Sequence, residues 1–224
     1  FLTKILEKLV FKFSNISTSV SIKEMKKIEL LYKKKTIFLP NGISLNVINS
    51  KKRVNEDYII YTGSYSYKPN KDAIDYLNIS IMPKLIKKFP KLKLILTGGG
   101  FNKEYPWVIN KGVINKNYLN QLLFSSKCLC VPLSFGSGTR IKIIEALSLG
   151  AIVLSTTKGI EGIDTSIKNP PFVVNSKKKL LKKVIDIINN NKKYKKKSIK
   201  AQKFFLQKYS MKNIINKFIN ENNI

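Results

Sequence analysis

The chain has 224 residues, of which 43% are hydrophobic, so it carries enough apolar material for a sizeable globular core. It has no run of about 18 apolar residues of the kind that forms a transmembrane helix. It also has no histidine and only two cysteines, which excludes Ser-His and Cys-His catalysis within these residues and leads us to expect no metal site.

The formal net charge is +29, and lysine supplies most of it. The base composition of the gene would account for this enrichment without any function, and we favour that interpretation. The functional alternatives are an anionic membrane surface and nucleic acid. Because no recognisable nucleic-acid-binding motif accompanies the lysine clusters at 33–35, 177–183 and 192–200, we expect no nucleic-acid partner, while peripheral association with an anionic membrane stays open.

The two cysteines, Cys128 and Cys130, fall in one predicted strand and are too close in sequence to bridge in strand geometry. We interpret them as small buried hydrophobic residues in a reducing compartment, which favours the cytoplasm. Lysines interrupt the apolar residues at the N-terminus, so a signal-peptide pattern is not seen there. The first residue is Phe1 and not Met, from which we expect a fragment of a longer protein.

In chain order, amphipathic helices are predicted at 1–13 and 22–33, the second capped by Ser21 with Glu24 in its first turn. A short strand at 36–39 and a polar linker at 44–56 follow. From there on, buried strands alternate with helices, which predicts an α/β fold with a parallel sheet and helices on both faces. The predicted strands are 57–62, 92–96, 107–110, 127–133, 151–155 and 172–174. The predicted helices are 71–88, which Pro83 should kink or divide, 116–125, 139–150, 176–190, 193–208 and 210–221.

Right-handed crossovers in such a sheet bring the glycine-rich loops to one edge, the carboxyl ends of the strands. Gly136 and Gly138 precede a helix, so backbone N–H groups could meet an anion there. The three glycines at 98–100 do not follow the Gly-x-Gly-x-x-Gly pattern, so a tight turn lining a cleft is the better interpretation. Together these loops predict a ligand cleft.

Glu145 is a carboxylate at the border of a mostly apolar predicted helix, and such a group needs a partner. A structural partner is available in Lys142, three residues back. A functional partner would be a pair of ligand hydroxyls, such as those of a ribose. The spacing alone leaves both interpretations open.

Five motifs in order resemble one protein family. They are residues 137–156, Pro40 to Gly42, Thr62 to Ser64 with Lys68 to Asn70, Thr97 to Gly100, and Lys158 to Gly162. This arrangement is similar to that of group 1 glycosyltransferases, which are retaining enzymes of the GT-B architecture with two Rossmann-like domains. The resemblance implies that this chain is mainly the C-terminal, donor-binding half. It assigns residues 1–43 to the end of an N-terminal acceptor-side domain, 44–56 to a linker, 57–208 to the nucleotide-sugar domain and 209–224 to a C-terminal helix.

The resemblance also implies roles for individual residues. Glu145 would match the glutamate that binds the ribose, and we expect Glu145 and Arg140 to be the residues that act on the donor. Residues predicted to contact it are Gly63, Ser64, Lys68, Gly98, Gly99, Gly112, Val113, Gly136, Ser137, Gly138 and Thr139. The donor, a nucleotide diphosphate sugar, is a substrate, and no cofactor is expected. The acceptor would be a glycan, a lipid-linked molecule or another acceptor.

The sequence departs from the family pattern at three positions. The first glutamate of the family's pair falls on Ser137, as in a branch with Gly-x-Gly-Thr-Arg at this point. The family's arginine and lysine of the first glycine turn fall on Ser64 and near Pro69, so Arg140 or Lys68 is a candidate for the phosphate role. A non-catalytic nucleotide- or anion-binding module is the alternative function, and a basic nucleic-acid-binding protein is a third.

Overall fold

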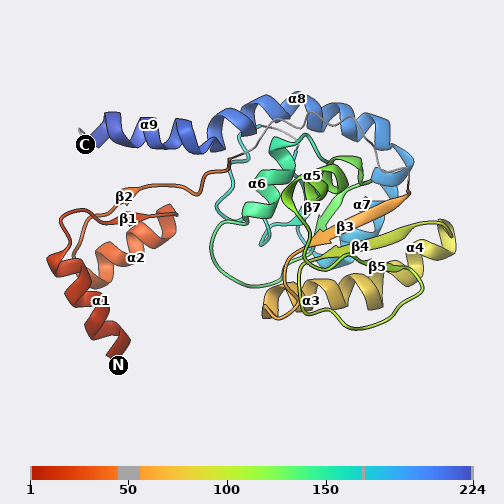
Figure 1. Cartoon of the computed structure of the whole chain (residues 1–224), viewed down its shortest axis with the longest axis horizontal. Helices are drawn as coiled ribbons and strands as arrows, with labels where there is room; N and C mark the ends of the chain where they lie inside the picture. Colours follow the sequence, from red (N-terminus) through yellow and green to blue (C-terminus); the bar gives the residue numbers. More distant parts are fainter. Residues whose placement is uncertain (1, 45–55, 168–169, 223–224) are drawn as a thin grey trace. The chain divides into compact units, whose positions relative to one another are not determined.

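A parallel six-stranded sheet with helices on both faces forms the larger part of the structure (Figure 1). The computed structural model describes residues 2–44, 56–167 and 170–222. These residues form two compact units, one made of the residues up to Ser44 together with those from Lys208 onward, and one made of the residues between them. The predicted linker at 44–56 lies, apart from its two end residues, outside the described residues.

Except at the two edges of the sheet, the strands of the larger unit are apolar and almost wholly buried. Their order in the sheet is β5-β4-β3-β6-β7-β8, and every pairing is parallel. Continuous apolar runs are typical of parallel strands that are covered on both faces. The predicted α/β fold with a parallel sheet is therefore confirmed. The strands are β3 (Tyr58–Thr62), β4 (Lys93–Thr97), β5 (Val108–Asn110), β6 (Leu129–Val131), β7 (Val153–Thr156) and β8 (Phe172–Val174).

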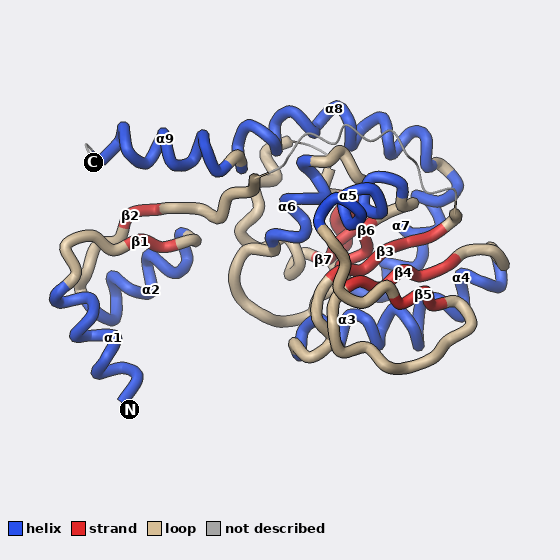
Figure 2. Tube along the Cα trace, viewed as in Figure 1, coloured by secondary structure: helices blue, strands red, loops and turns tan. Residues whose placement is uncertain are grey.

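Helices cover the two faces of this sheet. Figure 2 shows α3 (Lys68–Tyr76) and α4 (Met82–Lys88) on one face, and α5 (Lys116–Ser125) and α6 (Ile141–Ser148) on the other. Helix α7 (Lys177–Asn189) is tied to α3, because the Tyr76 hydroxyl donates to the Lys177 carbonyl at 2.8 Å. Helix α8 (Asn191–Tyr209) follows α7 and packs beside β6, where Asn191 Nδ2 donates to the Lys127 carbonyl.

The helix predicted at 71–88 differs from the observed one. It begins at Lys68, because Pro69 fits the first turn, where its missing N–H leaves no hydrogen bond unmade. A π-helical turn, Leu77–Ile81, separates α3 from α4 just before Pro83. Because proline cannot donate to the preceding turn, the wider turn accommodates it, and the expected division of this helix is confirmed.

The smaller unit contains α1 (Leu2–Phe13), β1 (Thr18–Ser19), α2 (Ile22–Tyr32), β2 (Ile37–Phe38) and α9 (Met211–Asn222). The expected cap is present, since the Ser21 hydroxyl accepts from the Glu24 N–H at 3.2 Å. Strands β1 and β2 pair in parallel. The start of α9 is fixed to residue 43 by two backbone hydrogen bonds, Ile43 N–H to Tyr209 O and Met211 N–H to Ile43 O.

Cys128 and Cys130 are fully buried free thiols at the start of and within β6. Burial raises the pKa of Cys128 to about 12, and burial together with the neighbouring Cys128 raises the pKa of Cys130 well above its ordinary value. They therefore stay protonated near neutral pH, in agreement with their interpretation as small hydrophobic core residues.

The register of β3 and β4 brings two glycine turns into direct contact. Thr62 lies opposite Thr97, so Gly63 and Gly98 leave the sheet side by side. Gly98 has a φ of +112°, and a Cβ there would lie 2.6 Å from both the carbonyl carbon and the oxygen of Gly63. Only glycine fits at Gly98 without moving a strand end.

We expect Gly98→Ala to lower the free energy of unfolding by about 2–4 kcal/mol, because backbone strain and overpacking each cost about 1–3 kcal/mol. The matched control is Gly99→Ala, whose Cβ would meet only a Val113 methyl at 4.0 Å and whose backbone is outside the left-handed region. Urea denaturation of both variants measures the difference. Equal stability of the two variants would contradict the contact.

Candidate functional site

The sequence placed its glycine turns at the carboxyl edge of the sheet, and four described turns meet there. The turn after β3 is bonded to the turn after β4 through Gly63 N–H to Thr97 O and Tyr65 N–H to Gly99 O, at 2.8 and 2.9 Å. The turn before α6 packs on the start of α3, because a Cβ on Gly136 would lie 3.2 Å from Pro69 Cγ. The turn after β7 reaches the same region, where a Cβ on Gly162 would lie 2.7 Å from Thr139 Oγ1.

Lys142, on the first turn of α6, is directed into this edge. Its ammonium donates to the Tyr61 hydroxyl at 3.1 Å, to Asn70 Oδ1 at 3.0 Å and to the Thr62 carbonyl. It also lies 4.2 Å from the centre of the Tyr61 ring. All of these partners are uncharged.

The environment of Lys142 disfavours its charge. Loss of contact with water is the main cause, and the positive charge of Arg140 is the second; together they lower the pKa of Lys142 to about 7. Within the described residues, no carboxylate forms an ion pair with this ammonium. The lysine is therefore suited to take up a proton when a negative charge arrives.

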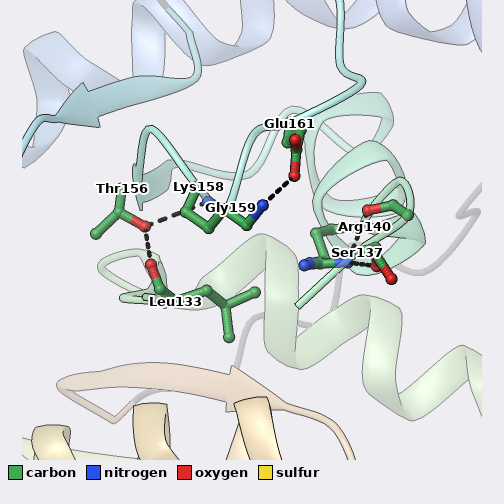
Figure 3. A network of polar contacts seen from close by, with 8 residues as sticks. Leu133, Ser137, Arg140, Thr156, Lys158, Gly159 and Glu161 are labelled. Atoms are coloured by element: carbon green, nitrogen blue, oxygen red, sulfur yellow. Dashed lines mark hydrogen bonds and ion pairs between the residues drawn. The ribbon is translucent and has the colours of Figure 1, made fainter. Parts of the chain in front are cut away.

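Arg140 is buried, with 8% of its surface exposed, at the residue before α6. Its Nη1 donates to the Gly138 carbonyl at 2.6 Å and to the Ser137 carbonyl (Figure 3). Its Nε and Nη2 are buried without a hydrogen-bond partner. A buried guanidinium with unsatisfied donors is costly, so this side chain is prepared for an acceptor that the protein itself does not supply.

The helix predicted at 139–150 is shorter than expected, because α6 begins at Ile141 and ends at Ser148. Gly138 has a φ of +79°, and Arg140 has extended backbone geometry, so residues 137–140 form a turn in front of the helix. Within the part of the chain that the structure describes, the N–H groups of Ser137, Gly138 and Thr139 donate to no protein acceptor. These N–H groups thus remain available for a ligand.

Glu145 faces away from Lys142, so the interpretation of Lys142 as its structural partner is wrong. Glu145 instead pairs with Lys116 in the first turn of α5, and 19% of its side chain is exposed against 44% for that of Lys116. The reason is geometric. Lys142 is drawn toward β3 and α3 by three acceptors, whereas the carboxylate lies on the side of α6 that faces α5.

The turn after β7 is held by its own hydrogen bonds, shown in Figure 3. The Thr156 hydroxyl donates to the Leu133 carbonyl at 2.5 Å and accepts from the Gly159 N–H at 3.2 Å. Lys158 and Glu161 form an ion pair at 2.5 Å. These bonds fix the segment that lies beside Thr139.

The remaining residues predicted to contact the donor lie on the turns around the carboxyl edge of the sheet. The Gly112 carbonyl accepts from the Gly98 N–H at 2.7 Å, which places 112 beside the turn after β4. Val113 is 85% exposed, an unusual state for a large apolar side chain. Ser64 and Lys68 are also exposed. The backbone carbonyl of Ser64 accepts a hydrogen bond from Asn70 Nδ2 at 2.9 Å.

Two hollows of the described surface lie away from the cations. One, of about 630 Å³, is lined by residues of the 101–110 loop. The other, of about 330 Å³, lies at the opposite edge of the sheet, near Asp57 and Lys127. We base the site on the cations and the free N–H groups, because they carry the chemistry that a ligand needs.

Two kinds of feature, a membrane-spanning helix and a metal-binding cluster, are not found among the described residues. None of their helices combines the length and the apolar character that crossing a bilayer requires. Among the same residues, no group of three or more histidine, cysteine, aspartate or glutamate side chains is arranged to hold a metal ion.

The fold and the site together define the class of protein: an α/β Rossmann-like domain of the GT-B type. Solved structures with a similar fold include a mutant of S. aureus TarM in complex with fondaparinux, α-GlcNAc-glycerol and UDP, with a TM-score of 0.78, 14% identity and coverage of 98% of this chain and 46% of that one. Another is Anabaena HepE in complex with UDP-glucose, with a TM-score of 0.72, 16% identity and coverage of 98% and 66%. At these identities the likeness shows the fold.

A family model described as glycosyl transferases group 1 matches residues 56–190, and the chain belongs to this family. A curated relative is an uncharacterized 44.6 kDa protein in the cps region of Klebsiella pneumoniae, 24% identical over 237 residues. That alignment covers 96% of this chain and 60% of the relative. The chain therefore spans less than two thirds of the length of this relative.

Sequence reasoning missed Lys142, Asn70 and Tyr61 as a connected group. One signal was present, since Lys142 interrupts the apolar run from Ile141 to Ile144 on a helix expected to be buried. The two partners of Lys142 lie 72 and 81 residues away in sequence, so only the folded chain reveals them.

The lowered pKa of Lys142 predicts a pH-dependent contribution to stability. Between about pH 7 and 10, the unfolded chain keeps a proton on Lys142 that the folded chain has released, so stability rises with pH. We therefore compare the free energy of unfolding of the wild type with that of Lys142→Met. The difference between them should grow in favour of the wild type by up to about 1.4 kcal/mol for each unit of pH in this window. Urea denaturation at several pH values measures it.

The control for this prediction is Lys84→Met, which removes an exposed lysine from α4. Its difference from the wild type should not change with pH over the same window. A flat difference for Lys142→Met as well would show that the folded ammonium keeps its ordinary proton affinity.

Proposed function

We propose that this chain is the donor-binding half of a retaining glycosyltransferase, which moves a sugar from a nucleotide diphosphate sugar to an acceptor. The observation that carries the proposal is the buried guanidinium of Arg140 with two unsatisfied donor nitrogens, at a helix start whose N–H groups are free of protein acceptors. A diphosphate is the anion that such donors suit. Membership of group 1 and the UDP and UDP-glucose complexes of the similar structures support the same ligand class.

In this proposal the domain acts on the leaving group. As the bond from the sugar to the diphosphate breaks, negative charge grows on the departing phosphate. Arg140 and the N–H groups of Ser137, Gly138 and Thr139 stabilise that charge. Because these donors are fixed before the reaction, little reorganisation is needed when the charge develops.

Glu145 is proposed to accept hydrogen bonds from the ribose hydroxyls. It reaches the site from the same short helix that follows the phosphate turn, and its carboxylate stays partly exposed. Its pairing with Lys116 leaves oxygen lone pairs available. The exposed side chain of Val113 and the backbone of Gly112 would lie beside the base, with Gly63, Ser64, Gly98 and Gly99 lining the turns below it. Lys68, which is exposed, would lie at the edge of the donor site.

The acceptor is proposed to be a glycan or a lipid-linked acceptor of cell-envelope polysaccharide biosynthesis, in the cytoplasm. The description of the curated relative as a protein in the cps region supports this setting. Exposed lysines on α8, including Lys196, Lys197 and Lys200, would favour peripheral contact with anionic lipid.

The alternative function is a non-catalytic nucleotide- or anion-binding module. It is favoured by Ser137, which stands where the family pattern has the first glutamate and contributes its carbonyl to Arg140. Binding of nucleotides without any transfer, even in a longer protein, would support this alternative.

The role of Glu145 is tested by Glu145→Gln, which keeps the size and removes the charge. A charge-assisted hydrogen bond contributes roughly 1.5–3 kcal/mol, so affinity for nucleoside diphosphates should fall about ten- to a hundredfold. Stability should change by less than about 1 kcal/mol, because the Lys116 partner is largely exposed. Calorimetric titration with UDP, GDP and ADP, alongside thermal melts, measures both.

Two further variants complete that experiment. Glu161→Gln, on the neighbouring loop, is the matched control and should bind like the wild type. Arg140→Ala should weaken diphosphates far more than nucleosides, because only diphosphates carry the charge that Arg140 would meet. Unchanged affinity in Glu145→Gln, for a nucleotide that the wild type binds, would remove Glu145 from the site.

We also expect these 224 residues alone to transfer sugar slowly or not at all. The acceptor and the exclusion of water require the other wall of a two-domain cleft. A turnover assay with UDP-glucose and other donors tests this. Rapid transfer by the chain alone would contradict the assignment of residues 1–43 and 57–208 to two different domains.

A further inference from the structure

The ammonium of Lys142 is held by side chains that are themselves fixed. Asn70 Oδ1 accepts from both Lys142 and the Tyr61 hydroxyl, the latter at 2.8 Å. The amide nitrogen of Asn70 donates to the Ser64 carbonyl at 2.9 Å. The lysine is thus joined to β3, to the first turn of α3 and to the loop between them.

This arrangement gathers positive charge without neutralising it. Besides Arg140, the titratable groups around Tyr61 and Lys142 are Tyr61 itself on β3, Tyr67 before α3, Asp72 on α3 and Cys130 on β6. The carboxylate of Asp72 is engaged by Lys177 at 2.7 Å. Within the described residues, two adjacent cations therefore face the turns with no carboxylate of their own, which an incoming anion would relieve.

Because residue 63 is glycine, no side chain separates its backbone from the ammonium of Lys142. A Cβ on Gly63 would lie 2.9 Å from Lys142 Nζ and 2.7 Å from Asn70 Nδ2. Any side chain at this position would displace the lysine or cover it. Gly63 has a φ of +138°, so a larger residue would also be strained.

We propose that Lys142 contacts the diphosphate of the donor directly, and that Asn70 and Tyr61 are the residues that position its ammonium. This inference rests on the proposed function. It supplies a phosphate-binding cation to a chain that has Ser64 and Pro69 where the family pattern has an arginine and a lysine. Lys68 is then not needed for that role, in keeping with its exposed position.

A direct contact has a consequence that a structural role lacks. Near pH 8 the free protein has Lys142 largely unprotonated, since its pKa is about 7. A diphosphate beside it favours the ammonium, so binding should take up a proton from solution. The terminal phosphate of a nucleoside diphosphate releases almost none at this pH, because its last pKa is near 6.

The test uses the whole chain, with UDP, GDP and ADP as probes. Calorimetric titrations at pH 8 in two buffers of different ionisation enthalpy give both the affinity and the number of protons taken up. For the wild type we expect uptake approaching one proton per diphosphate. Lys142→Met should bind the same probe about ten- to a hundredfold more weakly and take up close to none.

A second variant tests the positioning role without deleting the lysine. Asn70→Asp places a carboxylate at an atom that lies 3.0 Å from the ammonium. This carboxylate would stabilise the protonated form of Lys142 before any ligand binds, so proton uptake on binding should disappear. It would also compete with the phosphate for the ammonium, so affinity should fall. Lys84→Gln is the control for loss of one positive charge and should match the wild type, and thermal melts identify any variant that is unfolded.

The outcomes separate the two proposals. If no probe binds the wild type, the proposed function fails, and this inference fails with it. If a probe binds and Lys142→Met retains affinity within about twofold, or loses affinity with proton uptake unchanged, direct contact is refuted while the donor site stands. Wild-type-like proton uptake by a folded Asn70→Asp would refute the positioning role of Asn70.

Discussion

The unneutralised pair of cations, Arg140 and Lys142, is the feature on which the rest of the site depends. Two buried or half-buried positive charges close together are costly, and proteins usually offset such a cost with a carboxylate. Here the described surroundings supply neutral acceptors: carbonyls for Arg140, and a phenol, an amide and a carbonyl for Lys142. These acceptors orient both side chains but supply no negative charge. In the proposed function, that charge comes from the donor diphosphate.

The orientation of both cations depends on how closely the surrounding turns approach one another and the two side chains. Gly63 and Gly98 touch through their backbones, and Gly136 leaves room for the guanidinium, since a Cβ there would lie 2.9 Å from Arg140 Nη2. The parallel register of β3 with β4 determines the first of these contacts. Glycine is needed at these positions for two reasons together: the backbone has positive φ, and other groups occupy the space of a side chain.

The chain differs from the general pattern of its family in where its charges come from. The cations lie on the turn before α6 and on its first turn, whereas the positions after β3 carry Ser64 and Pro69. Ser137, at the position of a glutamate in the pattern, contributes a carbonyl that holds Arg140. This contact uses the backbone of residue 137, so the serine adds no charge beside the guanidinium.

The sequence by itself determined the class of fold and the edge at which the site lies. Apolar runs separated by amphipathic helices predict a parallel sheet, and the glycines after β3, β4 and β6 mark its carboxyl edge, because these patterns are local. The tertiary structure alone decided which side chains meet. Spacing alone left Lys142 and a ligand as candidate partners of Glu145, but Lys142 reaches Asn70 and Tyr61, while Glu145 pairs with Lys116 on a different helix. Spacing along one helix gives the angle between two side chains and nothing about the neighbouring elements. The strand order and register place α3, α5 and α6 around the same edge, and only then do their acceptors compete for each cation.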